Sequence, residues 1–381
     1  MKVLHYVSSF SPLSQTFIYD YITELEEQGV ENWVATFKRE NIEDRPFDKV
    51  IQLQMPGRWN LEKIIRRFYA VITNKPKMTH LWAQMRRELE KVVLDVEPDI
   101  IHAHFGPKGV EAATVANKLG KPFIVSFHGF DIFQIAQDPF WVNQYENILE
   151  SNCLVTCVSE YMKKHLLNIF PDSKLKVIHV GKRIENYSYN TPAKKIMQWL
   201  SIGRLAEKKG HEDTIRAFAE IINIFPNQKL RIIGGGERKK KLQQLIKDLD
   251  ISDYVTLVGS IPHHEVKNEL AEADAFILTS KTAKSGNKEG IPTVLMEAQA
   301  VGLPCVSTLH SGIPEAFPER NQKFLAEEAN VEQIAYKIRA LIESNKEEIE
   351  RISIRGRKKI EKDFNLVTEV KKIKKVYQTL I

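Results

Sequence analysis

Short runs of β-branched and apolar residues alternate with longer amphipathic stretches along the whole chain. In the first half, this pattern predicts strands over 2–7, 31–37, 99–105, 122–128, 152–159 and 174–181. The second half repeats the plan, with strands over 197–204, 229–236, 255–260, 275–280 and 304–309 and helices such as 211–223, 237–249 and 293–301. Most strand runs are apolar at nearly every position, as expected of parallel strands covered by helices on both faces. The alternation predicts an α/β protein with two doubly wound parallel sheets.

A polar stretch divides the two halves. Residues 185–195, ENYSYNTPAKK, contain a proline and have no apolar period, which is typical of a linker. The length of 381 residues also suits two domains better than one. We therefore expect an N-terminal domain over 1–184 and a C-terminal domain over 196–365.

Composition narrows the class of protein. Apolar residues make up 43% of the chain and charged residues 27%, as in a globular protein with real cores. No run of about 18 uncharged apolar residues is present, and the first residues lack a secretory pattern, so we expect a cytoplasmic protein. The three cysteines, Cys153, Cys157 and Cys305, fit buried small apolar side chains better than a disulfide framework or a zinc site. A net charge of +6 suits phosphates or an anionic membrane and does not argue for nucleic acid.

The segment 58–91 departs from the simple alternation. It carries nine Lys and Arg against three Glu, with Trp, Phe and Tyr interleaved. Two interpretations stand side by side. The favoured one is a pair of surface helices whose apolar stripe packs on the sheet; the other is peripheral contact with the inner face of an anionic membrane.

The stretch EGIPTVLMEAQA holds two carboxylates eight positions apart, Glu289 and Glu297. Pro292 stands near the first turn of the helix predicted over 293–301, where a proline is favourable. The start of that helix would offer unpaired N–H groups to a diphosphate. Glu297 would lie about two turns further along the helix, so the carboxylates could accept hydrogen bonds from two different sugars. The alternative is that both are solvated charges at a helix end.

Two further loops follow predicted strands. SIGRLAEKKG places Arg204 at the carboxyl end of a strand and Lys209 just before the next helix, where cations could neutralise a departing diphosphate, unless they are plain surface charges. IIGGG, at 232–236, lets the backbone approach a ligand closely. Its spacing is not G-x-G-x-x-G, and no acidic residue ends the strand over 255–260, so the sequence disfavours a dehydrogenase.

Histidines form the remaining candidates. His102 and His104 point to the same side of one predicted strand and suggest a metal pair, but no third ligand can be identified, so a structural role is favoured. His128 has the strongest functional case, against the alternative of a satisfied core histidine. The motif DLD at 248–250 falls at the end of a basic helix and is interpreted as solvated. We expect no metal.

Together these motifs resemble the retaining glycosyltransferases of family 4, which have the GT-B fold of two facing Rossmann-like domains. The resemblance covers nearly the whole chain and is strongest over 200–315. HAHFG (102–106), VSFHGFDI (125–132) and the EGIPTVLMEAQA…STLHSGIPE stretch are most similar to the colanic-acid and amylovoran type of exopolysaccharide glycosyltransferase. The loop SSFSPLSQTF lacks the paired glycines of many members, and PERNQKFLAEE replaces their glycine-containing turn, which weakens inference about the substrate.

The resemblance implies a role for each site residue. Arg204 and Lys209 would bind the donor diphosphate, Glu289 the hydroxyls of the transferred sugar, and Glu297 the ribose. His128 would lie beside the reacting sugar. A helix over 366–381 would cross back to the first domain. The other donor-binding positions would surround the nucleotide sugar: Gly203, Gly234, Gly259, Ile261, Gly290, Ile291, Pro292 and Thr293.

The expected activity is transfer of a hexose, with retention at the anomeric carbon, from a nucleotide-diphosphate sugar, UDP being favoured. The acceptor would be a polysaccharide precursor or a lipid-linked saccharide, and no cofactor is expected. Three alternatives are weighed against it. An inverting transferase or an epimerase would need another acid/base set. A non-catalytic nucleotide-sugar-binding subunit would bind without turnover, and a hydrolase built on the H-x-H would depend on metal.

Overall fold

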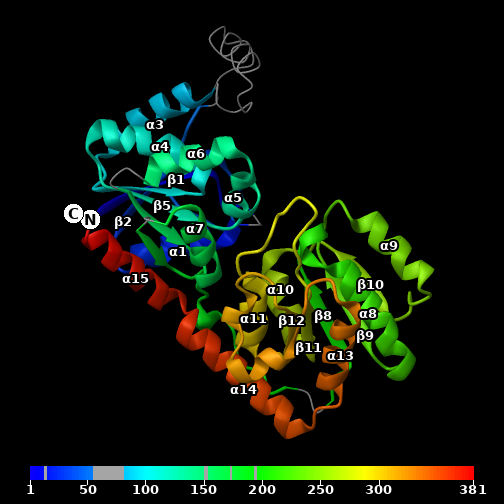
Figure 1. Ribbon diagram of the computed structural model, residues 1–381. Helices are drawn as coiled ribbons and strands as arrows, with labels where there is room; N and C mark the ends of the chain where they lie inside the picture. Colours follow the sequence, from blue (N-terminus) through cyan, green and yellow to red (C-terminus); the bar gives the residue numbers. More distant parts are fainter. Residues whose placement is uncertain (13–14, 55–80, 150–152, 172–173, 193–194) are drawn as a thin grey trace. The chain divides into compact units, whose positions relative to one another are not determined.

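The computed structural model describes residues 1–12, 15–54, 81–149, 153–171, 174–192 and 195–381. Its compact units are two. The N-terminal unit comprises Met1–Val158, Lys163–Ile178 and Val367–Ile381, and the C-terminal unit comprises Ser159–Met162 and His179–Leu366. Each unit is built around a parallel sheet of its own (Figure 1).

The described strands of the N-terminal unit form a seven-stranded sheet in the order β3-β2-β1-β4-β5-β6-β7. Every neighbouring pair is parallel. Strands β4 and β5 are buried at every position, which explains their unbroken apolar runs. The bounds of the strands are β1 (Lys2–Phe10), β2 (Glu31–Arg39), β3 (Val50–Gln52), β4 (Ile100–His104), β5 (Phe123–Phe127), β6 (Cys153–Cys157) and β7 (Leu175–Val177).

Helices cover this sheet, and the last helix of the chain is one of them. Tyr377 of α15 (Leu366–Gln378) is fully buried, and its hydroxyl lies 3.2 Å from that of Tyr21 in α1 (Thr16–Glu27). Figure 1 shows these two helices side by side. The other described helices are α3 (Trp82–Val96), α4 (Gly106–Leu119), α5 (Phe130–Phe133), α6 (Pro139–Leu149) and α7 (Glu160–Ile169), whose first residues belong to the other unit.

Residues 58–80 of the basic segment 58–91 lie outside the described residues. Its last part forms the start of α3, where Met85 and Leu89 are buried. Their spacing of four residues places both side chains on one face, as in an ordinary surface helix. None of the described helices is both long and apolar enough to cross a membrane.

The described strands of the C-terminal unit form a six-stranded parallel sheet in the order β10-β9-β8-β11-β12-β13. Two apolar cores flank it, one centred on Trp199 and Phe218 and the other on Phe276 and Met296. The bounds of the strands are β8 (Gln198–Ile202), β9 (Lys229–Ile233), β10 (Val255–Gly259), β11 (Ala275–Leu278), β12 (Cys305–Thr308) and β13 (Leu325–Ala326).

The segment before β8 packs on this unit. Tyr187 is buried in the second core, next to the short helix η4 (Ile184–Asn186), and Asn190 donates its N–H to the carbonyl of Val301. The predicted linker of 185–195 thus begins within the C-terminal unit. The described α-helices here are α8 (His211–Ile224), α9 (Lys239–Asp248), α10 (Val266–Glu272), α11 (Thr293–Val301), α12 (Ile313–Ala316), α13 (Val331–Ile342) and α14 (Lys346–Asp363).

The predicted fold class is confirmed: two doubly wound parallel sheets are present. Every predicted strand is found; β1 and β2 extend beyond their predicted ends at residues 7 and 37, and the other predicted strands are shorter than expected. Two of the described strands were not predicted. They are β3 and β13, each at one edge of its sheet, with three and two residues respectively. Runs this short are too brief to show a periodic pattern.

A close approach between two loops of the C-terminal unit requires glycine. Gly210 ends the loop after β8 with φ +69°, and a Cβ placed there would lie 1.7 Å from the carbonyl oxygen of Thr279, which follows β11. Gly259 also has positive φ, +95°, but a Cβ there would meet nothing within 4 Å. A side chain at Gly210 would therefore meet both backbone strain and a steric clash, whereas one at Gly259 would meet backbone strain alone.

We predict that Gly210→Ala lowers the free energy of unfolding of the C-terminal unit by about 3 kcal/mol, because a left-handed backbone and an overpacked contact both oppose the new methyl group. Gly259→Ala should cost about 1 kcal/mol, since only the backbone term applies. Urea unfolding followed by tryptophan fluorescence measures both. Equal losses for the two variants would contradict the close packing of Gly210 on Thr279.

Candidate functional site

A buried carboxylate lies at the centre of the candidate site. Glu289 is 9% exposed, and its Oε1 lies 3.3 Å from the Nζ atoms of both Lys208 and Lys209. Burial by itself raises the pKa of Glu289. The two ammonium groups lower this pKa by more than burial raises it, and the result is a pKa of about 2. Burial in turn lowers the pKa of Lys209, against the effect of Glu289. The carboxylate is therefore ionised and its charge is balanced by two cations.

The backbone of Glu289 is held by the loop after β12. Its N–H donates to Nε2 of His310 (3.0 Å), and its carbonyl accepts from the hydroxyl of Ser311 (2.7 Å). Because Nε2 of His310 accepts a hydrogen bond, the ring proton lies on Nδ1, which donates to Oε1 of Glu328 (2.6 Å). His310 and Glu328 thus orient Glu289 through its main chain.

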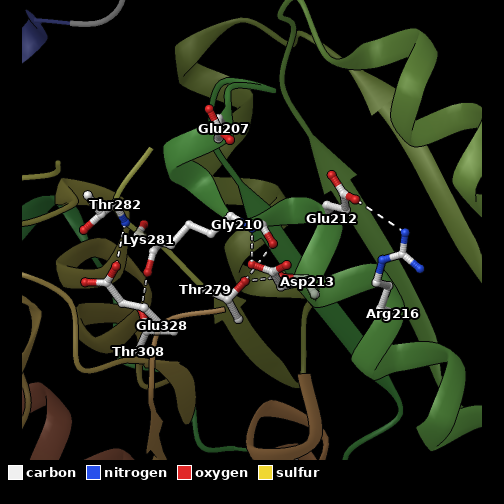
Figure 2. A network of polar contacts seen from close by, with 12 residues as sticks. Glu207, Gly210, Glu212, Asp213, Arg216, Thr279, Lys281, Thr282, Thr308 and Glu328 are labelled. Atoms are coloured by element: carbon white, nitrogen blue, oxygen red, sulfur yellow. Dashed lines mark hydrogen bonds and ion pairs between the residues drawn. The ribbon is translucent and has the colours of Figure 1, made fainter. Parts of the chain in front are cut away.

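The two lysines are positioned by a network that joins the loop after β8 to the end of β11 (Figure 2). The hydroxyl of Thr279 donates to the carbonyl of Gly210 (2.9 Å), and the Lys281 Nζ atom lies 2.7 Å from Oδ2 of Asp213. The N–H of Lys281 donates to the carbonyl of Lys208 (2.9 Å). The network continues to Glu328, which accepts from the N–H of Thr282 (2.6 Å).

Helix α11 begins at Thr293, shortly after Glu289 in the chain. Its N-cap is Pro292, one position before the predicted first turn, and the cap has no side-chain hydrogen bond. In the first turn, the N–H of Leu295 donates to the carbonyl of Pro292 (3.1 Å), which leaves the N–H groups of Thr293 and Val294 for an anion. Gly290, Ile291, Pro292 and Thr293 form the connection between the carboxylate and this helix end, and Ile291 is buried in the second core.

Glu297 lies on the buried side of α11 and has a partner that the sequence did not indicate. Its Oε1 lies 2.5 Å from Nζ of Lys182, and both side chains are almost fully buried. A buried charge is stable only beside a counter-charge, so Lys182 and Glu297 stabilise each other. Sequence reasoning missed Lys182 because it lies 115 positions earlier in the chain, in a segment with no recognisable motif.

Arg204 presents a guanidinium to solvent. The Arg204 side chain is exposed and makes no hydrogen bond or ion pair with any residue that the structure describes. It follows Gly203, over which the Lys209 side chain packs: a Cβ on Gly203 would lie 3.3 Å from Lys209 Cδ. Gly234, at φ +148°, brings the loop after β9 against the carbonyl of Gly203. Arg204 and Lys209 thus lie in one loop, close to Gly203 and Gly234.

Gly259 and Ile261 lie further along the same edge of the sheet. Gly259 is the last residue of β10, and Ile261 is partly buried against the second core. The predicted donor-binding residues therefore lie at the carboxyl ends of β8, β9 and β10, and in the loop and helix that follow β11. This is the edge at which open α/β sheets bind ligands.

His128 lies in the N-terminal unit, directly after β5. Its N–H and that of Gly129 donate to Asp131, and Asp131 also accepts from the N–H of Gly106 at the start of α4. Burial raises the pKa of Asp131 to about 6, although the three N–H donors lower it. Asp131 thus joins the loop after β5 to that after β4 and fixes the backbone of His128.

A possible third ligand to the H-x-H pair does exist. Among the described residues, one group has metal-ligand spacing: His5, His102 and His104, whose ring nitrogens lie within 4.8 Å of one another. His5 faces His102 because β1 and β4 pair in register, a relation the sequence does not reveal. All three rings are buried, and each ring nitrogen already lies within hydrogen-bond distance of a protein group. Protein groups therefore lie within hydrogen-bond distance of every ring nitrogen in this cluster.

The structure therefore brings together most of what the sequence predicted in the C-terminal half and adds several residues. Lys208 could have been found from its place beside Lys209, and His310 from its place in the LHSGIPE motif. Lys182, Glu328 and His5 carry no such local signal.

Two compact units, each built on a doubly wound parallel sheet, match the fold class of the GT-B glycosyltransferases. Family models match the chain as "Glycosyltransferase Family 4" over 14–184 and as "Glycosyl transferases group 1" over 186–359. The putative colanic acid biosynthesis glycosyltransferase WcaL of Escherichia coli is 30% identical over 96% of both chains. The amylovoran biosynthesis glycosyltransferase AmsK of Erwinia amylovora is 35% identical over 70% of this chain and 67% of its own.

Structural comparison agrees. HepE of Anabaena, solved in complex with UDP and glucose, superposes with a TM-score of 0.78 at 19% identity, covering 100% of both chains. This similarity shows the GT-B fold. The chain belongs to glycosyltransferase family 4, and it is an enzyme of the glycosyltransferase class.

We predict that Glu289→Gln destabilises the C-terminal unit by about 3 kcal/mol at pH 7, because two buried ammonium groups lose their counter-charge. The pKa of Glu289 lies below its unfolded value, so its stabilisation is present above pH 4.5 and is lost as the pH falls toward 2. About 2 kcal/mol of the difference between wild type and variant should therefore disappear between pH 7 and pH 3.

Urea unfolding of both proteins at pH 7, 5 and 3 measures this difference. Glu269→Gln, which removes the partner of Arg231 on the surface, serves as a control and should show little loss at any pH. A difference between wild type and Glu289→Gln that stays constant with pH would show that Glu289 is not held ionised by the lysines.

Proposed function

We propose that the protein transfers a hexose from a nucleotide-diphosphate sugar to a polysaccharide precursor or a lipid-linked saccharide, with retention at the anomeric carbon. The observation that carries this proposal is the buried carboxylate of Glu289, held between Lys208 and Lys209 at the carboxyl edge of the C-terminal sheet. It combines an acceptor for sugar hydroxyls with cations for a diphosphate in one place.

The diphosphate is assigned to the cations and the helix start. The Arg204 side chain is exposed and has no ion pair among the described residues, Lys209 shares the cluster, and the N–H groups of Thr293 and Val294 lie at the start of α11. When the bond from the anomeric carbon to the diphosphate oxygen breaks, negative charge develops on the leaving group. Preorganised cations and N–H dipoles stabilise that charge. Lys208, which shares Glu289 with Lys209, is added to this set.

The carboxylates are assigned to hydroxyl groups. Glu289, fixed through its backbone by His310 and Ser311, accepts hydrogen bonds from the transferred sugar. Glu297 accepts from the ribose while it keeps its ion pair with Lys182. A carboxylate has lone pairs for several donors, so the two contacts are compatible. Gly290–Thr293 line the sugar and phosphate, Gly203 and Gly234 allow close backbone approach, and Gly259–Ile261 lie near the base.

His128 is assigned to the reacting sugar. In the proposed reaction, the acceptor hydroxyl oxygen bonds to the anomeric carbon, the diphosphate leaves with the electron pair, and the hydroxyl proton ends on the diphosphate or in solvent. His128 binds a hydroxyl of the sugar and so orients it for this exchange. We propose that no metal ion takes part, since the cations needed for charge stabilisation are side chains.

Donor and acceptor are proposed from similarity. HepE was crystallised with UDP and glucose and also with UDP-glucose, which supports a UDP-sugar donor here. WcaL and AmsK are named for colanic acid and amylovoran biosynthesis, which supports an exopolysaccharide precursor as acceptor. The cytoplasmic location, and the contact of 58–91 with an anionic membrane, stay predictions.

We predict that UDP or a UDP-sugar raises the melting temperature of the wild-type protein, whereas GDP and ADP do not. A ligand at a hundred times its Kd adds about 2.7 kcal/mol of stability, which a thermal-shift assay detects readily. Arg204→Ala should abolish the rise in melting temperature, because in this proposal the Arg204 guanidinium binds the diphosphate of the nucleotide. Arg339→Ala, an exposed arginine paired with Glu343 on α13, should keep it.

A rise in melting temperature with GDP or ADP instead of UDP would identify that nucleotide as part of the donor. The proposed binding site would stay the same. No shift with any nucleotide, in the presence and absence of a lipid-linked acceptor, would contradict donor binding itself. A shift without any turnover would favour the non-catalytic subunit.

We further predict that Lys209→Met lowers kcat by a factor of about 10²–10³, because one preorganised stabiliser of the leaving group is removed. Lys247→Met, at an exposed position of α9, serves as the matched control and should leave kcat unchanged. Proton NMR of the reaction follows both rate and stereochemistry. The product formed first should have the same anomeric configuration as the donor, with or without EDTA.

An inverted product would overturn the retaining mechanism while leaving the site intact. Loss of activity with EDTA, restored by a divalent cation, would overturn metal independence.

A further inference from the structure

A line of hydrogen-bonded side chains crosses the N-terminal sheet. It starts at Asn32 on β2, passes through His5 on β1 and His104 on β4, and ends at His128 after β5. Because the sheet order is β2-β1-β4-β5, each member lies on a strand adjacent to the next. The rings of His5 and His104 stack at 5.4 Å, and those of His104 and His128 at 5.5 Å. We refer to these four residues as the imidazole chain.

The contacts of the imidazole chain are single hydrogen bonds. Asn32 Oδ1 lies 3.0 Å from His5 Nε2, His5 Nδ1 lies 3.1 Å from His104 Nε2, and His104 Nδ1 lies 3.3 Å from His128 Nε2. The last nitrogen, His128 Nδ1, is buried and has no hydrogen-bond partner among the described residues. The chain therefore ends on one unsatisfied ring nitrogen.

Asn32 fixes the direction of every bond. Its amide nitrogen donates to the carbonyl of Val30 (2.8 Å), so its oxygen is the group that faces His5. A carbonyl oxygen only accepts, so His5 carries its proton on Nε2. Reversing the amide would place its oxygen against that carbonyl, which is unfavourable.

The remaining tautomers follow one after another. Burial lowers the pKa of His5 to about 4 and that of His104 well below its ordinary value, and it lowers the pKa of His128 to about 3. Each ring is therefore neutral and has one N–H. Since His5 Nε2 is protonated, Nδ1 accepts from His104 Nε2–H. His104 Nδ1 then accepts from His128 Nε2–H.

We propose that Asn32, His5 and His104 are positioning residues that hold His128 in its Nε2–H tautomer, so that its Nδ1 presents a lone pair to a hydroxyl of the donor sugar. The tautomer follows from the N-terminal unit alone, whereas the identity of the hydroxyl rests on the proposed function. A buried acceptor without a partner destabilises the free protein, and a sugar O–H would satisfy it. The proposal thus explains why the polar chain ends unsatisfied at the carboxyl end of β5.

A metal ion at His5, His102 and His104 would lead to the opposite tautomer. Coordination through His5 Nδ1 and His104 Nε2 would break their mutual hydrogen bond. His104 would then carry its proton on Nδ1 and donate it to His128 Nε2, leaving His128 with Nδ1–H, a donor. His102 lies outside the imidazole chain, and both of its ring nitrogens already have protein partners, at 2.7 Å from the Tyr377 hydroxyl and 2.6 Å from the Ser126 hydroxyl.

The test is a long-range ¹H–¹⁵N NMR spectrum of the protein labelled with [¹⁵N]histidine, recorded at pH 7 without substrate, with metal content measured on the same sample. We expect His5, His104 and His128 each as the neutral Nε2–H tautomer, and metal well below one equivalent. A His128 signal with Nδ1–H, with both nitrogens protonated, or with stoichiometric bound metal would overturn the proposal.

Variants test the effect at a distance. Asn32→Leu removes the anchor, so the Nδ1–H form of His128 should appear and kcat/KM should fall about fivefold, the effect of losing one ordinary hydrogen bond. Ser126→Ala is the matched control. It deletes a buried hydrogen bond to His102 on the same face of the sheet but leaves the imidazole chain complete, so the His128 tautomer should not change. An unchanged His128 tautomer in Asn32→Leu would also overturn the proposal.

The proposed function and the positioning role of the imidazole chain can each fail without the other. If the tautomers are as expected but no nucleotide sugar is ever turned over, the imidazole chain stands and the proposed function fails. If transfer is observed and His128 is the Nδ1–H tautomer, the function stands and the positioning role fails. The wild-type spectrum decides the tautomer even where Asn32→Leu does not fold.

Discussion

The burial of Glu289 is the constraint on which the candidate site depends. An ionised carboxylate inside a protein is stable only when cations and hydrogen bonds replace its water. Lys208 and Lys209 supply the charge, and they can do so only where the loop after β8 turns back at Gly210 toward Thr279. The positive φ of Gly210, the Thr279 contact and the lysine positions are thus consequences of one electrostatic requirement. Loops from three strands are held in place around a single charge.

The N-terminal unit solves a similar problem without charge. Its buried histidines lack carboxylate partners along the imidazole chain, and burial keeps them neutral. Neutral imidazoles can pair only donor to acceptor, so a fixed amide such as that of Asn32 sets the order of all of them. His310 in the C-terminal unit follows the same rule with the opposite tautomer, because a backbone N–H occupies its Nε2. In both units, the hydrogen-bond partner of one ring nitrogen determines which of the two nitrogens carries the proton.

The fold could be predicted from the sequence because parallel strands buried on both faces give continuous apolar runs that need no long-range information. The site in the C-terminal half could be predicted in part, because Glu289, Gly290 and Pro292 are neighbours in one motif. What could not be predicted are partners set by strand order. His5 is 97 positions from His102, and only the register of β1 on β4 brings them together. Lys182 was missed for the same reason, and β3 and β13 were missed because they are too short to show a period.

The pairing of Glu297 with Lys182 links the donor site to the places where the chain passes between units. The N–H of Lys182 donates to the carbonyl of Phe364 (2.8 Å), and its carbonyl accepts from the N–H of Leu366 (2.9 Å). Next to it, a Cβ on Gly181 would lie 2.5 Å from the Cα of Leu366, so the two segments run in direct backbone contact. The chain enters the C-terminal unit for the last time at His179 and leaves it after Leu366, so these two crossings both lie close to Lys182 in the chain or in backbone contact. Since the same side chain holds Glu297 at 2.5 Å, any movement of the crossing segments would also move the carboxylate assigned to the ribose. The buried ion pair therefore couples the orientation of Glu297 to the backbone that joins the units, which local helix geometry alone would not do.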